Sequence, residues 1–128
     1  MIMVAVMSLS GGMLLISDEM KKLEGDRFEL IRSSLDLNRE CAPHTPLPLG
    51  LMEAGFPRGL YNPAGYLGVW NPTEKPERVS FPIPARLDHA ALRRAREYRT
   101  DQKMPWHIRE NRIFIALAPF ESMIARIH

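Results

Sequence analysis

The sequence predicts an α+β fold, with a helix–strand–helix unit at the N-terminus and a small antiparallel β-sandwich after it. No charged side chain occurs in the first 17 residues, and apolar residues at helical spacing follow up to residue 35. Beyond residue 60, short runs of aromatic and β-branched residues alternate with polar, proline-containing turns. The first pattern is typical of buried helix and strand, and the second of antiparallel strands. With 128 residues, the chain can bury one modest core.

The N-terminal unit is expected to span residues 1–38. Met1–Ser10 has no polar face, which indicates a buried helix. Met13–Ile16 is an unbroken apolar run between two glycines and two polar residues, as in a strand buried on both faces. Ser17 and Asp18 follow this strand, and their side chains are expected to cap the next helix at its N-terminus.

The helix after the expected strand is interrupted by Gly25. We therefore predict a short first turn at Glu19–Leu23 and a second helix capped by Asp26. Residues 39–59 are rich in turn-forming residues and follow neither the helical nor the strand period, so they are expected to form a linker.

Residues 60–128 are expected to form the β domain, with about five or six strands. The expected elements are strands at Tyr66–Trp70, Arg78–Ile83, Arg96–Thr100, Arg112–Leu117 and Ser122–Ile127, and a short helix within Ala85–Ala95. The polar turn at residues 71–76 predicts a hairpin of the first two strands, and the turn at residues 118–121 predicts a hairpin of the last two. Alternation places one buried face on each of three strands. These faces are formed by Val79, Phe81 and Ile83, by Ile113, Ile115 and Leu117, and by Met123, Ala125 and Ile127.

The N-terminal pattern resembles the last βα unit of the α-galactosidase (melibiase) glycoside hydrolases of the family 36 and 27 type. The residues that carry the resemblance are Met1–Ser10, Gly11-Gly12, Met13–Ile16, Ser17-Asp18, Leu23 and Asp26-Arg27. Downstream, Leu67–Asn71 and Leu117–Ser122 are similar to two strand edges of the family's C-terminal domain, although Phe120 stands where the family usually has His.

The resemblance implies the last helix–strand–helix of a (β/α)8 catalytic barrel, followed by a C-terminal antiparallel β domain. The whole enzyme would hydrolyse terminal α-linked galactosides with two aspartates from earlier barrel strands, which this chain does not contain. The chain would then be structural, with a catalytic barrel or a partner chain covering residues 1–16. A homo-oligomer would cover the same apolar surface.

Asp18 is the strongest candidate for a catalytic carboxylate, because it follows the expected barrel strand at the end where such barrels hold their active sites. A retaining glycosidase needs two carboxylates about 5 Å apart. Asp18 and Glu19 cannot form that pair, since neighbours on a helix point in different directions. We therefore favour the capping role for Asp18 and predict no catalytic residue in this chain.

Other candidate sites are weaker. Cys41 and His44 have C-x-x-H spacing, which is half of a zinc site, so no metal and no cofactor is expected. Trp70 and Trp106 are candidates for stacking against a sugar ring, with Trp70 expected to face the core and Trp106 expected in an exposed loop. The segment Arg93–Arg112 holds seven basic and three acidic residues, and forms either an anion-binding patch or, as we favour, a solvated face.

Composition narrows the function classes. A net charge of +2 is too small to indicate nucleic-acid binding. The N-terminal apolar run is too short and too interrupted for a membrane span, and it lacks the basic start of a signal peptide. The single cysteine excludes an intrachain disulfide and leaves the compartment open, with the cytoplasm slightly favoured. Two alternatives to a hydrolase fragment stay open: a carbohydrate-binding β module, and an interaction domain that docks through its apolar N-terminus.

Overall fold

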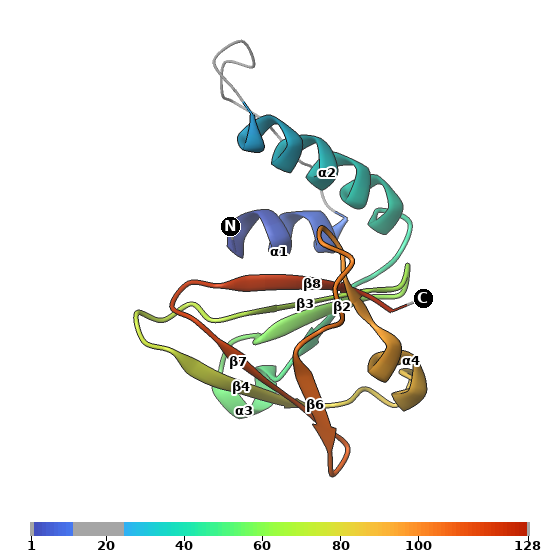
Figure 1. Ribbon diagram of the computed structural model, residues 1–128. Helices are drawn as coiled ribbons and strands as arrows, with labels where there is room; N and C mark the ends of the chain where they lie inside the picture. Colours follow the sequence, from blue (N-terminus) through green and yellow to red (C-terminus); the bar gives the residue numbers. More distant parts are fainter. Residues whose placement is uncertain (1, 12–24, 128) are drawn as a thin grey trace.

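The computed structural model describes residues 2–11 and 25–127, which form three layers (Figure 1). Two helices lie on the outer face of one β-sheet, and a second sheet packs against the inner face of the first. The mixture of helices with antiparallel sheets confirms the α+β class. The helices are α1 (Ile2–Ser10), α2 (Asp26–Cys41), α3 (Leu51–Ala54) and α4 (His89–Arg94).

The strands belong to a five-stranded and a three-stranded sheet, in which all the pairings are antiparallel. The five-stranded sheet has the order β1-β2-β3-β8-β5 and the three-stranded sheet the order β4-β7-β6. The strands are β1 (Leu47–Leu49), β2 (Gly59–Asn62), β3 (Tyr66–Trp70), β4 (Glu77–Pro82), β5 (Arg96–Glu97), β6 (Trp106–Arg109), β7 (Arg112–Leu117) and β8 (Ser122–Arg126).

Both predicted hairpins are wrong. Strand β3 pairs with β2 and β8, whereas β4 pairs with β7, so β3 and β4 lie in different sheets. Strands β7 and β8 are separated in the same way. The two polar turns carry the chain from one sheet to the other, which a sequence pattern of strand–turn–strand does not distinguish from a hairpin.

The side chain of Asn71 joins these two crossing turns. It is fully buried, and its Nδ2 donates to the carbonyls of Lys75 (2.8 Å) and Ala118 (3.1 Å). Its Oδ1 accepts from the backbone N–H of Thr73 (3.0 Å), and its own backbone N–H donates to the carbonyl of Glu121 (2.9 Å). Because a buried amide must satisfy its donors and acceptors, Asn71 fixes the first turn against the second.

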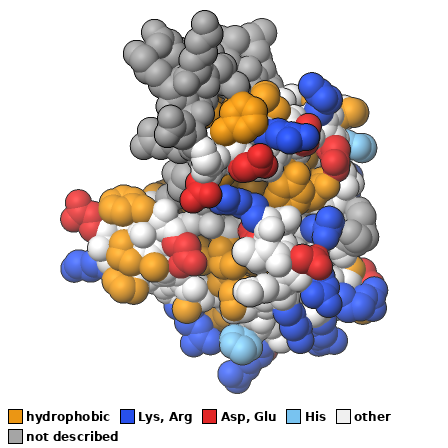
Figure 2. Space-filling view, turned by 45° about the horizontal axis from the view of Figure 1, so that its top comes forward, with side chains coloured by type: hydrophobic (Ala, Val, Ile, Leu, Met, Phe, Trp, Pro, Cys, Tyr) orange, Lys and Arg blue, Asp and Glu red, His pale blue; other side chains and the backbone are white. Residues whose placement is uncertain are grey.

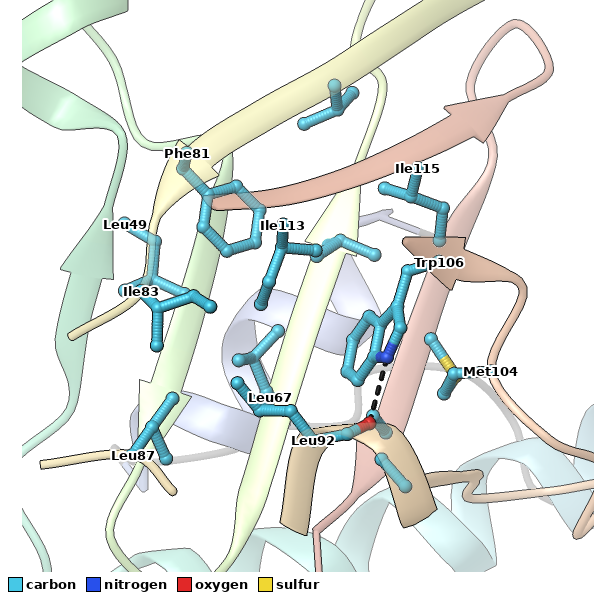
Figure 3. Close-up of a cluster of buried hydrophobic side chains, with 14 of the residues drawn as sticks. Leu49, Leu67, Phe81, Ile83, Leu87, Leu92, Met104, Trp106, Ile113 and Ile115 are labelled. Atoms are coloured by element: carbon cyan, nitrogen blue, oxygen red, sulfur yellow. Dashed lines mark hydrogen bonds between the residues drawn. The ribbon is translucent and has the colours of Figure 1, made fainter. Parts of the chain in front are cut away.

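The main core lies between the two sheets (Figure 3). Its fully or nearly fully buried members include Leu67, Val69, Val79, Phe81, Ile83, Ile113, Ile115, Leu117 and Ala125. The predicted inward faces of the strands at residues 78–83, 112–117 and 122–127 are therefore confirmed. Helix α4 closes one end of this core with Leu92, which is completely buried.

A second, smaller core lies between the five-stranded sheet and helices α1 and α2. Leu9 and Leu37 enter it from the helices, and Leu60, Tyr66 and Trp70 from the sheet. At Gly68 a Cβ atom would stand 2.3 Å from the Cδ1 of Leu9, so any larger residue there would displace the buried Leu9 side chain. The apolar face of α1 is thus packed against the protein's own sheet.

The amide of Asn62 holds the ends of both helices to that sheet. It is fully buried, and its Nδ2 donates to the carbonyls of Leu9 (2.9 Å) and Cys41 (3.2 Å). Leu9 is in the last turn of α1 and Cys41 ends α2, so the C-terminal ends of the two helices meet at one residue. Consecutive helices α1 and α2 therefore run side by side in the same direction (Figure 1).

Several local predictions need correction. Gly25, not Asp26, is the N-cap of α2, and Asp26 lies in the first turn of the helix. The expected linker, 39–59, contains the end of α2, strand β1 and helix α3. Strands β2 and β6 were also not predicted, and β5 is shorter than expected. The expected strand Met13–Ile16, the turn Glu19–Leu23 and the caps Ser17 and Asp18 lie outside the described residues.

Within the residues that the structure describes, helix length and hydropathy rule out a membrane-spanning helix.

The two faces of β7 offer a matched stability test. Ile115 is 1% exposed in the main core, whereas its neighbour Phe114 lies on the outer face under the guanidinium of Arg78 (5.2 Å). Ile115→Ala should lower the free energy of unfolding by about 2–4 kcal/mol, because a cavity adds to the lost transfer energy. Phe114→Ala should lower the free energy of unfolding by less, because the Phe114 side chain is only partly buried. Urea denaturation of both variants measures the difference, and equal, small losses would contradict the register.

The contact between Gly68 and Leu9 can be tested with a double-mutant cycle. Gly68→Ala should destabilise the protein by about 1–3 kcal/mol, because the new methyl group overlaps Leu9. Leu9→Ala removes the overlapping atoms, so the double variant should be more stable than the sum of the single losses by about 1 kcal/mol. Additive losses would show that α1 does not pack on Gly68 in solution.

Candidate functional site

The tryptophans, which were the candidates for sugar stacking, are both buried. Trp70 is 5% exposed under the helices, and its Nε1 donates to the carbonyl of Pro57 (3.1 Å). Trp106 is 8% exposed in the main core, and its Nε1 donates to the carbonyl of Leu92 (2.9 Å), as Figure 3 shows. The expectation that Trp106 is exposed is therefore wrong, since it begins strand β6 rather than lying in a loop. The two rings belong to different cores and share no surface.

The C-x-x-H pair does not form a ligand set. Cys41 is completely buried at the end of α2, and His44 is exposed, with its backbone N–H donating to the carbonyl of Cys41 (3.0 Å). Burial, with a smaller contribution from the charge of Glu40, raises the pKa of the Cys41 thiol to about 11. Among residues 2–11 and 25–127, no group of three or more His, Cys, Asp or Glu side chains could hold a metal ion.

A cleft with a volume of about 250 Å³ lies between helices α1 and α2 and strands β5 and β8. Several of its polar side chains are engaged in local hydrogen bonds. Ser33 and Ser34 donate to the carbonyl of Leu30, at 3.0 and 2.6 Å. The carboxylate of Glu97 accepts from the backbone N–H groups of Arg99 and Thr100, and that of Glu121 accepts from Ala118. These groups fix local turns and do not converge on a common point.

Two tyrosines and a carboxylate form a polar cluster beside this cleft. The hydroxyl of Tyr66 donates to the carboxylate of Glu40, and the rings of Tyr66 and Tyr98 meet edge to face at 5.7 Å. Burial and the bond to Glu40 raise the pKa of Tyr66 well above its usual range, and burial also raises the pKa of Tyr98. The bond from Tyr66 to Glu40 joins α2 to strand β3, so the cluster anchors α2 on the sheet.

A second hollow, of about 460 Å³, lies between α4 and the end of β8. Arg94, Arg96 and Arg126 line it, together with Ala91 and Ile127. The basic segment predicted from the sequence supplies the first two arginines. Arg126 comes from strand β8. It joins the other two arginines because β8 pairs with β5, 30 residues away in the sequence, and that pairing cannot be predicted from the sequence pattern.

No protein-family model, no curated protein and no solved structure matches this chain.

The buried thiol of Cys41 predicts a loss of stability at alkaline pH. Its pKa is about 11 in the folded protein and 9.0 when unperturbed, so its contribution is intact below pH 9. That contribution is lost as the pH rises from 9 toward 11, because the unfolded chain ionises first. Over this range the loss should reach roughly 2–3 kcal/mol. Urea denaturation under reducing conditions, at pH 7.5 to 10, measures the early part of this fall.

Cys41→Ala is the control for this measurement. The variant should be less stable at pH 7.5, because it leaves a small cavity, but its stability should change little between pH 8.5 and 10. Above pH 10 the stability of both proteins should fall further, because burial also raises the pKa of Tyr66 and the unfolded chain ionises first. A wild-type protein whose stability is flat up to pH 10 would show that Cys41 is accessible to solvent.

Proposed function

We propose that this chain is the non-catalytic C-terminal part of an α-galactosidase-type glycoside hydrolase, in which a β-sandwich braces the last helices of a (β/α)8 barrel. The proposal starts from the sequence resemblance. The parallel course of α1 and α2 is the structural observation that supports it most directly.

Two consecutive parallel helices need a connection that returns the chain along their length. In a (β/α)8 barrel a strand makes this return between each pair of neighbouring helices. Helix α2 has 16 residues, or about 24 Å. The 13 residues from 12 to 24 lie between α1 and α2 in the sequence and have a maximum length of about 43 Å, which exceeds the length of α2.

The contacts of the helix layer suit a bracing role. Leu9, Leu37 and Cys41 are completely or almost completely buried against the sheet, and Asn62 bonds to the ends of both helices. Any larger body that contains α1 and α2 would thus be held to the sandwich through a packed core.

The structure supports the two alternative functions, a carbohydrate-binding module and an interaction domain, to different degrees. A carbohydrate-binding module needs exposed rings on one surface, and Trp70 and Trp106 are both buried. An interaction domain has better support, though at another place than the apolar N-terminus. Large apolar side chains are exposed around β1 and α3, namely Leu47, Leu51, Met52 and Phe56.

The proposal can be tested by complementation. An α-galactosidase barrel of the family 36 type would be truncated before its last helix–strand–helix unit and co-expressed with this chain. We expect α-galactosidase activity on a chromogenic substrate to appear only when both pieces are present. The chain alone should be inactive, because its proposed role includes no catalytic residue.

Gly68→Ala is the matched variant, since it should loosen the helix layer from the sandwich and reduce complementation without touching the substrate. Turnover by the chain alone that disappears in Asp18→Asn would overturn the non-catalytic role. A barrel that gains neither solubility nor activity from the chain would contradict the bracing role.

A further inference from the structure

The structure places like charges opposite one another at one end of the five-stranded sheet. Arg96 of β5 is directly opposite Arg126 of β8, and on its other side it is opposite Lys103 through an isolated bridge. Directly opposed residues of antiparallel strands project to the same face with their Cβ atoms about 5 Å apart. Three basic side chains thus stand in one row across the strands, an arrangement that destabilises a sheet unless an anion compensates it.

Among the residues that the structure describes, Asp101 brings its carboxylate to this row. Asp101 accepts from Nη2 of Arg126 through Oδ1 (3.0 Å), and its backbone carbonyl accepts from Nη1 of Arg96 (2.8 Å). The nearby Glu97 is engaged with the backbone N–H groups of its own turn. Within the described part of the chain, the carboxylate of Asp101 therefore faces three cations, and Asp101 holds two of the guanidinium groups in place.

Arg94 adds a fourth cation from the neighbouring helix. It lines the same hollow as Arg96 and Arg126, and makes no side-chain hydrogen bond or ion pair within the part of the chain that the structure describes. The hollow has Ala91 and Ile127 beside the arginines, and its volume is in the range of small-molecule sites. Lys and Arg side chains gather at the lower right in Figure 2, the side on which α4 lies in Figure 1.

Protection of a sheet edge does not explain this arrangement. Single charges on edge strands prevent pairing with other chains. Arg126, however, lies on β8, which is an interior strand between β3 and β5. Arg96 is flanked on both sides by paired residues.

We propose that the hollow formed by Arg94, Arg96 and Arg126 binds a small multivalent oxyanion, a ligand with two adjacent phosphate or carboxylate groups. Guanidinium groups bind such oxygens through paired, charge-assisted hydrogen bonds. The ligand would supply the negative charge that Asp101 alone does not. This site is independent of the proposed role of the chain as a brace.

The site can be tested by titrating the full chain with inorganic pyrophosphate and, separately, with citrate, at constant ionic strength. Isothermal titration calorimetry should show saturable binding of at least one anion with a Kd of about 1 mM or below. Binding of pyrophosphate alone identifies a phosphate-bearing ligand, and binding of citrate alone identifies a carboxylate-bearing ligand. If a sulfated polysaccharide saturates the protein but neither small anion does, the basic surface binds extended polyanions and the proposal is overturned.

Three variants and a control localise the binding. Arg94→Gln and Arg96→Gln should each weaken it about tenfold, the usual loss for one charge-assisted hydrogen bond. Asp101→Asn should tighten it about threefold or more, because it removes the competing charge while asparagine tolerates the left-handed backbone (φ 58°). Arg109→Gln, an exposed arginine on β6 with the same charge change, should leave it within about twofold.

Arg94→Gln keeps the test decisive should Arg96→Gln fail to fold, because the Arg94 side chain has no hydrogen-bond or ion-pair partner among residues 2–11 and 25–127. Equal effects of Arg94→Gln and Arg109→Gln would show that net charge alone attracts the anion. That result, or the absence of saturable binding, would overturn the proposed site.

Discussion

The helix layer depends on one buried amide, that of Asn62. A helix ends with carbonyl groups that have no partner within the helix, and these groups carry the negative end of the helix dipole. Asn62 offers its Nδ2 to both helix ends, through the carbonyls of Leu9 and Cys41. Its Oδ1 accepts from the backbone N–H of Ala64 (2.9 Å), which fixes the amide orientation in the turn after β2. The position of both helices is therefore set by the sheet rather than by a contact between the helices alone.

A second buried asparagine performs the corresponding task between the two sheets. Asn71 follows β3 directly, and its bonds reach the turn that leads from β7 to β8. Each asparagine connects segments about 20 to 50 residues apart, through a side chain that is completely buried. Buried amides of this kind add little net stability on average, but leaving a partner unsatisfied is costly, so they specify one arrangement against others.

The sequence predicted what depends on local pattern. The alternation in residues 78–83 and 112–117 identified the strands and their buried faces, because a two-residue period is a direct consequence of burying one face. Strand pairing was not predictable in the same way, because a turn such as residues 71–76 can join strands of one sheet or of two. The prediction of an exposed loop for Trp106 is wrong for a similar reason. The ring is buried by Leu92 and by residues of the opposite sheet, which are distant from it in the sequence. The basic segment was recognised, but Arg126, which completes the hollow, was not.

The order of the layers limits what the chain can do by itself. The main core between the sheets is made of residues from the strands, from α4 and from the loops beside α4, whereas α1 and α2 contribute to the smaller core on the outer face. The sandwich therefore has an interior that does not need the helices, but the helices need the sheet, because Leu9 and Leu37 have their buried contacts there. A body attached through α1 and α2 would inherit its orientation from Asn62 and Gly68. The row formed by Arg126, Arg96 and Lys103 lies toward the β5 side of the same sheet, and none of its residues belongs to α1 or α2.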